Sequence, residues 1–135
     1  LGKTTLARSI AASTLLAGHA VAWIDATRTL DPRDFIDVDA AGRDALWVVR
    51  PGDPARAAWC ADLLLRTGAF ALVVLDSAPV LPRTIAVRLS QLARDADASL
   101  LLLGEGTKAS EIGGALRLVL KRRPARDTRG GPQVA

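Results

Sequence analysis

The sequence predicts an α/β fold in which a mostly parallel sheet is covered by helices on both faces. Several short runs are apolar throughout, as strands buried on both sides are. Segments with helical periodicity alternate with these runs along the chain. The 135 residues, half of them hydrophobic, suffice for one core of ordinary size. No apolar run approaches the roughly 20 residues that a membrane-spanning helix needs.

The first elements follow from local sequence. A helix is expected from Lys3 to about Ala17, with Leu6 and Ile10 on its buried stripe and Gly18 as its stop. The apolar run Ala20–Asp25 predicts a buried strand with Trp23 in the core.

The next segment is polar and rich in Asp as far as Arg43, so we expect a loop with a short helix around Phe35. A second apolar run at Ala45–Val49 predicts another strand, again with its tryptophan, Trp47, in the core.

The second long helix has clear ends. Asp53 supplies a cap, Pro54 occupies the first turn, and Gly68 ends the helix. Trp59 and Leu63 lie four residues apart and are expected on the buried side.

The remaining elements alternate in the same way. Phe70–Leu75 and Leu100–Leu103 predict buried strands, and a helix with Ile85 on its buried face is expected between them, from Arg83 to about Asp97. The segment from Ala115 to Lys121 alternates apolar and polar side chains, which is typical of a half-exposed strand near a sheet edge.

Charge divides the chain into a balanced core, residues 1–120, and a basic tail, residues 121–135, which we expect to be flexible. The net charge is +4, and the tail accounts for all of it, so a nucleic-acid groove across the whole body is not indicated. The tail either contacts DNA phosphates or an acidic partner, or is simply solvated. Its basic residues are Lys121, Arg122, Arg123, Arg126 and Arg129.

Cysteine and histidine are scarce. One Cys and one His exclude an internal disulfide framework and a zinc site, and they fit a cytoplasmic protein in a reducing compartment.

Two short motifs carry chemistry. Gly2-Lys3-Thr4-Thr5 runs directly into the first helix, and phosphate groups need backbone N–H donors at a helix N-terminus, a cation and a hydroxyl for Mg²⁺. Asp76 ends a buried strand, where a carboxylate is costly unless a metal ion or a partner needs it. An ordinary helix cap and an ordinary strand-end cap are the alternative interpretations of the two motifs.

With these motifs in this order, the sequence resembles the RecA family of recombinase-type ATPases. The matching stretches are Gly2–Leu6, Trp23–Ala26 with Leu30–Pro32, Phe70–Ser77 and Ala115–Arg123. The resemblance implies a RecA-like P-loop NTPase core lacking its first strand. It also implies ATP with Mg²⁺ between subunits of a homo-oligomer, a filament on DNA and a role in DNA repair.

The resemblance also assigns roles to individual residues. It places Thr4 and Asp76 on Mg²⁺ and Asp31 near the adenine amino group. The residues that it assigns to the nucleotide are Gly2, Lys3, Thr4, Thr5, Asp31, Asp76 and Ser77.

The departures from the family affect catalysis and DNA binding. Thr27 stands where the family has its catalytic Glu, and a hydroxyl cannot act as that general base. Asp25 is the one candidate substitute, two residues earlier. The two DNA-binding loops are shortened to Pro79–Thr84 and roughly Glu105–Gly114.

With these departures and the basic tail, the sequence resembles ImuA-type RecA-like accessory proteins of bacterial damage-induced mutagenesis. That resemblance implies support of translesion synthesis through protein partners, a polymerase-like protein and RecA, with weak or absent ATP hydrolysis. One alternative is an active, DNA-dependent RecA-family ATPase. The other is an unrelated P-loop kinase or partitioning ATPase.

One expectation concerns the sheet itself. In this family the strand that precedes the phosphate loop is interior to the sheet, and the chain lacks it. We therefore expect that the full protein supplies the missing segment, or that the sheet has a gap between Phe70–Leu75 and Leu100–Leu103 or is repaired by pairing with another copy.

Overall fold

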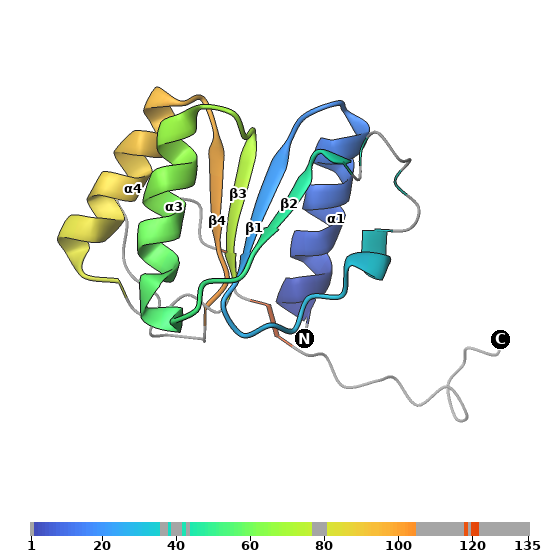
Figure 1. Ribbon diagram of the computed structural model, residues 1–135, viewed down its shortest axis with the longest axis horizontal. Coiled ribbons are helices and arrows are strands. Elements are labelled where there is room, and N and C mark those ends of the chain that lie inside the picture. The colour runs from blue at the N-terminus through green and yellow to red at the C-terminus, as the bar shows by residue number, and fades with distance from the viewer. Residues whose placement is uncertain are drawn as a thin grey trace, which may run out of the picture.

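Four parallel strands form one sheet in the computed structural model, which describes residues 2–35, 38, 42, 44–76, 81–104, 118, 120 and 121. The strands are β1 (Val21–Asp25), β2 (Leu46–Val49), β3 (Leu72–Asp76) and β4 (Ser99–Leu102). Their order across the sheet is β2-β1-β3-β4. Helices alternate with the strands along the chain, so the predicted α/β fold with a parallel sheet is confirmed (Figure 1).

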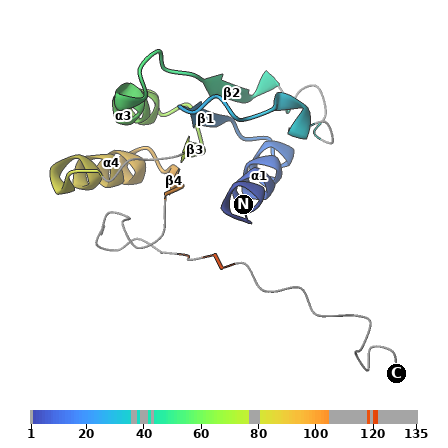
Figure 2. The same cartoon turned by 90° about the horizontal axis from the view of Figure 1, so that it is seen from below.

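The helices cover both faces of this sheet. Helix α1 (Gly2–Leu16) lies on one face, and α3 (Ala57–Thr67) and α4 (Arg83–Asp95) lie on the other (Figure 2). Two 3-10 turns, η1 (Pro32–Phe35) and η2 (Pro54–Arg56), complete the described elements. The turn at η1 confirms the short helix expected around Phe35.

Alternate side chains of the central strands enter two separate hydrophobic clusters. Ile24 and Leu75 pack with α3 and α4, whereas Trp23 and Val74 pack on the side of α1. All four are fully buried. The continuous apolar runs in the sequence thus reflect strands that are covered on both faces.

The predicted stop of α3 is confirmed, whereas the cap predicted at Asp53 belongs to the 3-10 turn η2 that leads into α3 at Ala57. The Asp53 carboxylate accepts a hydrogen bond of 2.9 Å from the backbone N–H of Ala55, at the start of η2. Gly68 ends α3 in the left-handed conformation, with φ of 67°, which glycine adopts without strain.

In α1 and α3 the buried side of the helix is not the predicted one: each helix is rotated about its axis relative to the prediction. Leu6 and Ile10 are each 37% exposed, and Trp59 is 53% exposed. The buried positions are Ala7, Ala11 and Leu15 in α1, and Ala57, Ala61 and Leu65 in α3. Small Ala side chains let a helix axis approach the sheet closely, so alanines take most of the inward positions, and Leu6, Ile10 and Trp59 lie at the margin.

In α4 the expected buried position of Ile85 is also wrong, because Ile85 is 38% exposed. The buried residues of this helix are Ala86, Leu89 and Ala93.

The two strand tryptophans also differ. Trp23 in β1 is fully buried, as expected, but Trp47 is 58% exposed. Trp47 lies on β2, at the edge of the sheet, and its ring meets Phe70 edge to face at 5.8 Å between centroids. An apolar run does not distinguish an edge strand from a central one, which explains the error.

The expected gap in the sheet is absent. Strands β3 and β4 are directly paired, with Leu72 opposite Ser99 and Leu75 opposite Leu102. The pairing continues beyond β4, because the Leu103 N–H donates to the Leu75 carbonyl at 3.0 Å. The expectation of a gap between these two strands is therefore wrong.

The expected edge strand at Ala115–Lys121 lies mostly outside the described residues. The described Leu118, Leu120 and Lys121 are exposed. Within the described part of the chain, no helix is long and apolar enough to cross a membrane.

Candidate functional site

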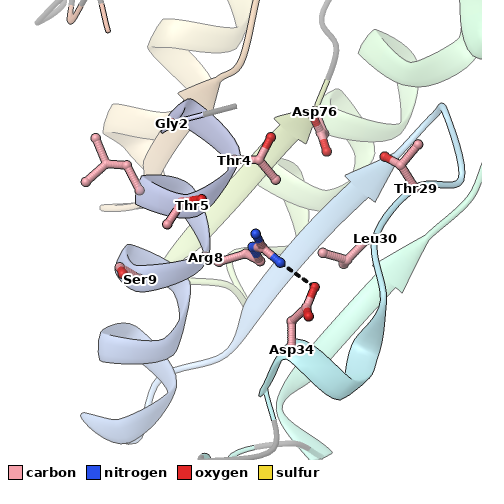
Figure 3. Close-up of a pocket in the computed structure, with 10 residues that line it drawn as sticks. Gly2, Thr4, Thr5, Arg8, Ser9, Thr29, Leu30, Asp34 and Asp76 are labelled. Carbon is pink, nitrogen blue, oxygen red and sulfur yellow. Dashed lines mark hydrogen bonds and ion pairs between the residues drawn. The ribbon is translucent and has the colours of Figure 1, made fainter. Parts of the chain in front are cut away.

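The carboxyl ends of the parallel strands meet the beginning of α1 at one edge of the sheet. Asp25 ends β1 and Asp76 ends β3, and the two residues are partners in the strand register. Thr4, in the first turn of α1, directs its side chain into the same space as Asp76 (Figure 3). A helix N-terminus with its N–H groups therefore lies beside a strand-end carboxylate.

A cavity of about 790 Å³ extends from this edge along α1. Its lining brings together four residues predicted to bind nucleotide, which come from two distant segments: Gly2, Thr4, Thr5 and Asp76. The other lining residues are Leu6, Arg8, Ser9, Thr29, Leu30 and Asp34.

Lys3 lies at the same edge, although it does not line the cavity. Its Nζ donates a hydrogen bond of 2.7 Å to the carbonyl oxygen of Gly104. Gly104 comes shortly after β4, the neighbour of β3, so the ammonium group lies at the same end of the sheet as Asp76. Lys3 and Asp76 are thus on one side of the molecule, as the two motifs predicted.

An ion pair forms the far end of the cavity. Arg8, one turn beyond Thr4 on α1, contacts Asp34 of η1 with 2.5 Å between Nη1 and Oδ2 (Figure 3). Each side chain is about one-third exposed. Sequence reasoning did not single out Arg8 or Thr29, because both become cavity residues only when α1 meets the loop after β1. Leu30 belongs to a stretch that resembles the RecA family, but it was given no role there.

Asp31, which the resemblance assigns to adenine, does not line the cavity. Its carboxylate accepts hydrogen bonds of 3.1 and 3.0 Å from Nε of Arg33, and Arg33 lowers the pKa of Asp31. The pair is largely exposed.

The candidates for a general base are placed unequally. Thr27 is exposed, and its hydroxyl lies 3.1 Å from that of Thr29. Asp25 is fully buried, and it accepts hydrogen bonds from the N–H groups of Thr29 and Leu30 and from Arg50. The Asp25 carboxylate is thus engaged by groups of the protein itself.

Several predicted site residues lie outside the described part of the chain. These are Ser77, Arg122, Arg123, Arg126 and Arg129, together with positions 79 and 80 of the first shortened loop and the whole of the second, residues 105–114. Of the basic tail cluster, Lys121 is described and is exposed.

A metal ion at this site would draw on few protein ligands. Among the described residues, no three His, Cys, Asp or Glu side chains gather as a metal cluster. Mg²⁺ in phosphate-binding sites commonly takes one or two protein oxygens and completes its shell with phosphates and water. Thr4 and Asp76 fit that limited requirement.

The fold and site define a parallel α/β protein with a cavity, lined by both polar and apolar side chains, at the carboxyl ends of its strands. Comparison with protein families gives a match to the RecA N-terminal domain over residues 1–99. The chain belongs to the RecA N-terminal domain family.

Individual relatives agree with this assignment. Over 83 residues, the chain is 43% identical to Protein RecA of Nocardioides sp. and 41% identical to Protein RecA of Nocardia farcinica. Each alignment covers 61% of this chain, and 23% and 24% of the two relatives. Protein RecA of Mycobacterium tuberculosis is 41% identical over 83 residues, which are 10% of its length. The chain thus spans a quarter or less of these relatives.

Proposed function

We propose that the cavity at the edge of the sheet binds the triphosphate of ATP together with Mg²⁺. The arrangement of Lys3, Thr4 and Asp76 at the N-terminal end of α1 is the observation that carries this proposal. Backbone N–H groups and the Lys3 ammonium would contact phosphate oxygens. The Thr4 hydroxyl and the Asp76 carboxylate would hold Mg²⁺, which neutralises the charge of the phosphates.

We further propose that ATP hydrolysis is weak or absent. A general base must lie within hydrogen-bond reach of the attacking water. Thr27 offers only a hydroxyl, and Asp25 is fully buried with its oxygens engaged by Thr29, Leu30 and Arg50. The remaining cavity carboxylates are Asp34, paired with Arg8, and Asp76, which the proposal assigns to Mg²⁺.

The cellular role that fits these features is a RecA-like accessory function in bacterial DNA repair, in damage-induced translesion mutagenesis. Membership of the RecA N-terminal domain family supports the RecA-like part. Thr27 and the basic tail favour an accessory over a recombinase. The protein would act by binding a polymerase-like protein and RecA, with DNA contacted through the tail.

Steady-state ATP hydrolysis by the full-length protein, with and without single-stranded DNA, tests the catalytic part. We expect turnover at background, the same in wild type and in Lys3→Ala. DNA-stimulated turnover that Lys3→Ala abolishes would instead establish the active RecA-family ATPase. Thr27→Glu sharpens the test, because it should raise turnover only if the missing carboxylate limits catalysis.

The accessory role is tested separately, by sedimentation of the purified full-length protein with RecA. We expect a complex that survives the combined Arg122→Ala and Arg123→Ala substitutions, while affinity for DNA falls in that variant. Absence of any complex with RecA would contradict the partner-binding role.

The alternative of an unrelated P-loop kinase or partitioning ATPase receives no support from the family match. Transfer of phosphate from ATP to a small-molecule acceptor would be the result that favours a kinase.

A further inference from the structure

The loop that follows β1 forms one wall of the cavity, opposite α1. It contributes Thr29 and Leu30 to the lining. Arg28 in this loop has a positive φ of 59°, a left-handed conformation that residues other than glycine adopt rarely and at some cost in energy. Other contacts must offset this cost for the wall to keep its shape.

Four hydrogen bonds supply such contacts. The two Asp25 oxygens accept from the N–H groups of Thr29 and Leu30, each at 3.0 Å. Arg50, just beyond β2, donates from Nε to Asp25 at 3.1 Å and from Nη2 to the Leu30 carbonyl oxygen at 2.8 Å. One guanidinium thus fastens both the carboxylate that holds the loop and the loop itself.

The chemistry of these groups explains why an arginine stands at this position. Asp25 is fully buried, and a buried carboxylate needs an opposite charge as well as hydrogen bonds. Arg presents several donors in a rigid, planar fork, whereas the Lys ammonium is a point charge on a flexible stem. A lysine could neutralise Asp25 but could not keep the same two-point geometry.

We infer that Arg50 is a positioning residue for the nucleotide, setting the cavity wall formed by Thr29 and Leu30 without touching the ligand. This inference rests on the proposed nucleotide binding. A wall fixed before the ligand arrives lowers the ordering cost of binding, so loosening the wall weakens affinity even when the fold persists.

The test compares Arg50→Lys with a matched control, Arg33→Lys, in the full-length protein. Arg33 also pairs with an aspartate, Asp31, but that pair is exposed and outside the cavity. Urea unfolding gives stability, and calorimetric titration with ATP and Mg²⁺ gives affinity. We expect Arg50→Lys to stay folded at the assay temperature and to lose affinity by about threefold to tenfold, the equivalent of about one hydrogen bond. Arg33→Lys should bind as wild type does.

Amide hydrogen exchange supplies a second measurement that does not require tight binding. In Arg50→Lys the Thr29 and Leu30 amides should exchange faster, while the β3 amides keep their wild-type rates. Faster exchange throughout the sheet would mean that Arg50 supports only global stability, and it would overturn the inference.

The outcomes separate the two proposals. Normal ATP binding by wild type with unchanged affinity in Arg50→Lys would overturn the positioning role alone. A wild-type protein that binds no ATP would overturn the proposed nucleotide site and the positioning role with it.

Discussion

The two faces of the sheet are built for different purposes. On one face, α3 and α4 lie side by side over a continuous cluster that includes Leu65, Leu75 and Leu89 (Figure 2). On the other face, α1 and η1 cover the apolar strands and leave an open cavity between them, which Thr4, Arg8 and Asp34 help to line. The difference shows how the cavity arises: one face is covered by two long helices that pack together, whereas the other has one long helix and a short 3-10 turn with a space between them.

The largest expected effect belongs to the closed face. Leu89→Ala should lower the free energy of unfolding by about 2–5 kcal/mol, because Leu89 is 1% exposed and its loss leaves a cavity in the core. Urea unfolding measures this cost. The affinity of the folded variant for ATP should equal that of wild type. Weaker binding would contradict the claim that the face covered by α3 and α4 does not contribute to the nucleotide site.

The next effect belongs to the open face. Lys3→Ala should weaken ATP binding at least tenfold, because a hydrogen bond between charged groups contributes about 1.5–3 kcal/mol. Calorimetric titration with ATP and Mg²⁺ measures it. The free energy of unfolding should change far less, since Lys3 is only partly buried. An unchanged affinity would remove Lys3 from the site.

A smaller effect concerns the ion pairs across α3 and α4. Asp62 contacts Arg88 of α4 and Arg66 of its own helix, and the hydrogen bond from Arg88 is the main cause that lowers the pKa of Asp62 from its ordinary value. Asp62→Asn should cost about 0.5–1 kcal/mol at neutral pH, because two ion pairs are lost and solvent screens both of the exposed arginines.

The pH dependence of this cost follows from the sign of the shift. A lowered pKa means that Asp62 stabilises the fold fully above the unfolded value, and that this contribution disappears as the pH falls through the lowered value. The difference between wild type and Asp62→Asn should therefore shrink below about pH 4. A difference that stays constant down to pH 2 would show that Asp62 acts through packing.

The smallest effect concerns the ion pair at the end of the cavity. Arg8→Gln should lower the free energy of unfolding by only about 0.2–1 kcal/mol, because a partly exposed pair is screened by solvent. Thermal unfolding at low and high salt measures it. The loss should be smaller at high salt, and a loss above 2 kcal/mol at either salt concentration would contradict this account of the pair.

Sequence alone predicted the features that depend on local chemistry. The Asp53 cap, the Gly68 stop and the parallel strands are encoded by neighbouring residues. The first turn of α1 and Asp76 lie together because strands in one parallel sheet end at one edge. Features that depend on which neighbour packs where were not predictable. Trp47 is exposed because β2 is an edge strand.

Long-range polar contacts explain the remaining differences. Arg50 is 25 residues from Asp25, and Arg8 is 26 residues from Asp34, so no local pattern marks either pair. A buried carboxylate at the end of β1 does indicate that some cation must come to it. The sequence gives no means of choosing Arg50 among the many arginines.

The central claim is that the first turn of α1 and the end of β3 together hold a nucleotide with Mg²⁺. The most direct measurement is the ATP affinity of the full-length protein with and without Mg²⁺, in wild type and in the isosteric variant Asp76→Asn. We predict that Mg²⁺ tightens binding in wild type and has much less effect in Asp76→Asn. An equal effect of Mg²⁺ in both proteins, or no ATP binding by wild type, would contradict the claim.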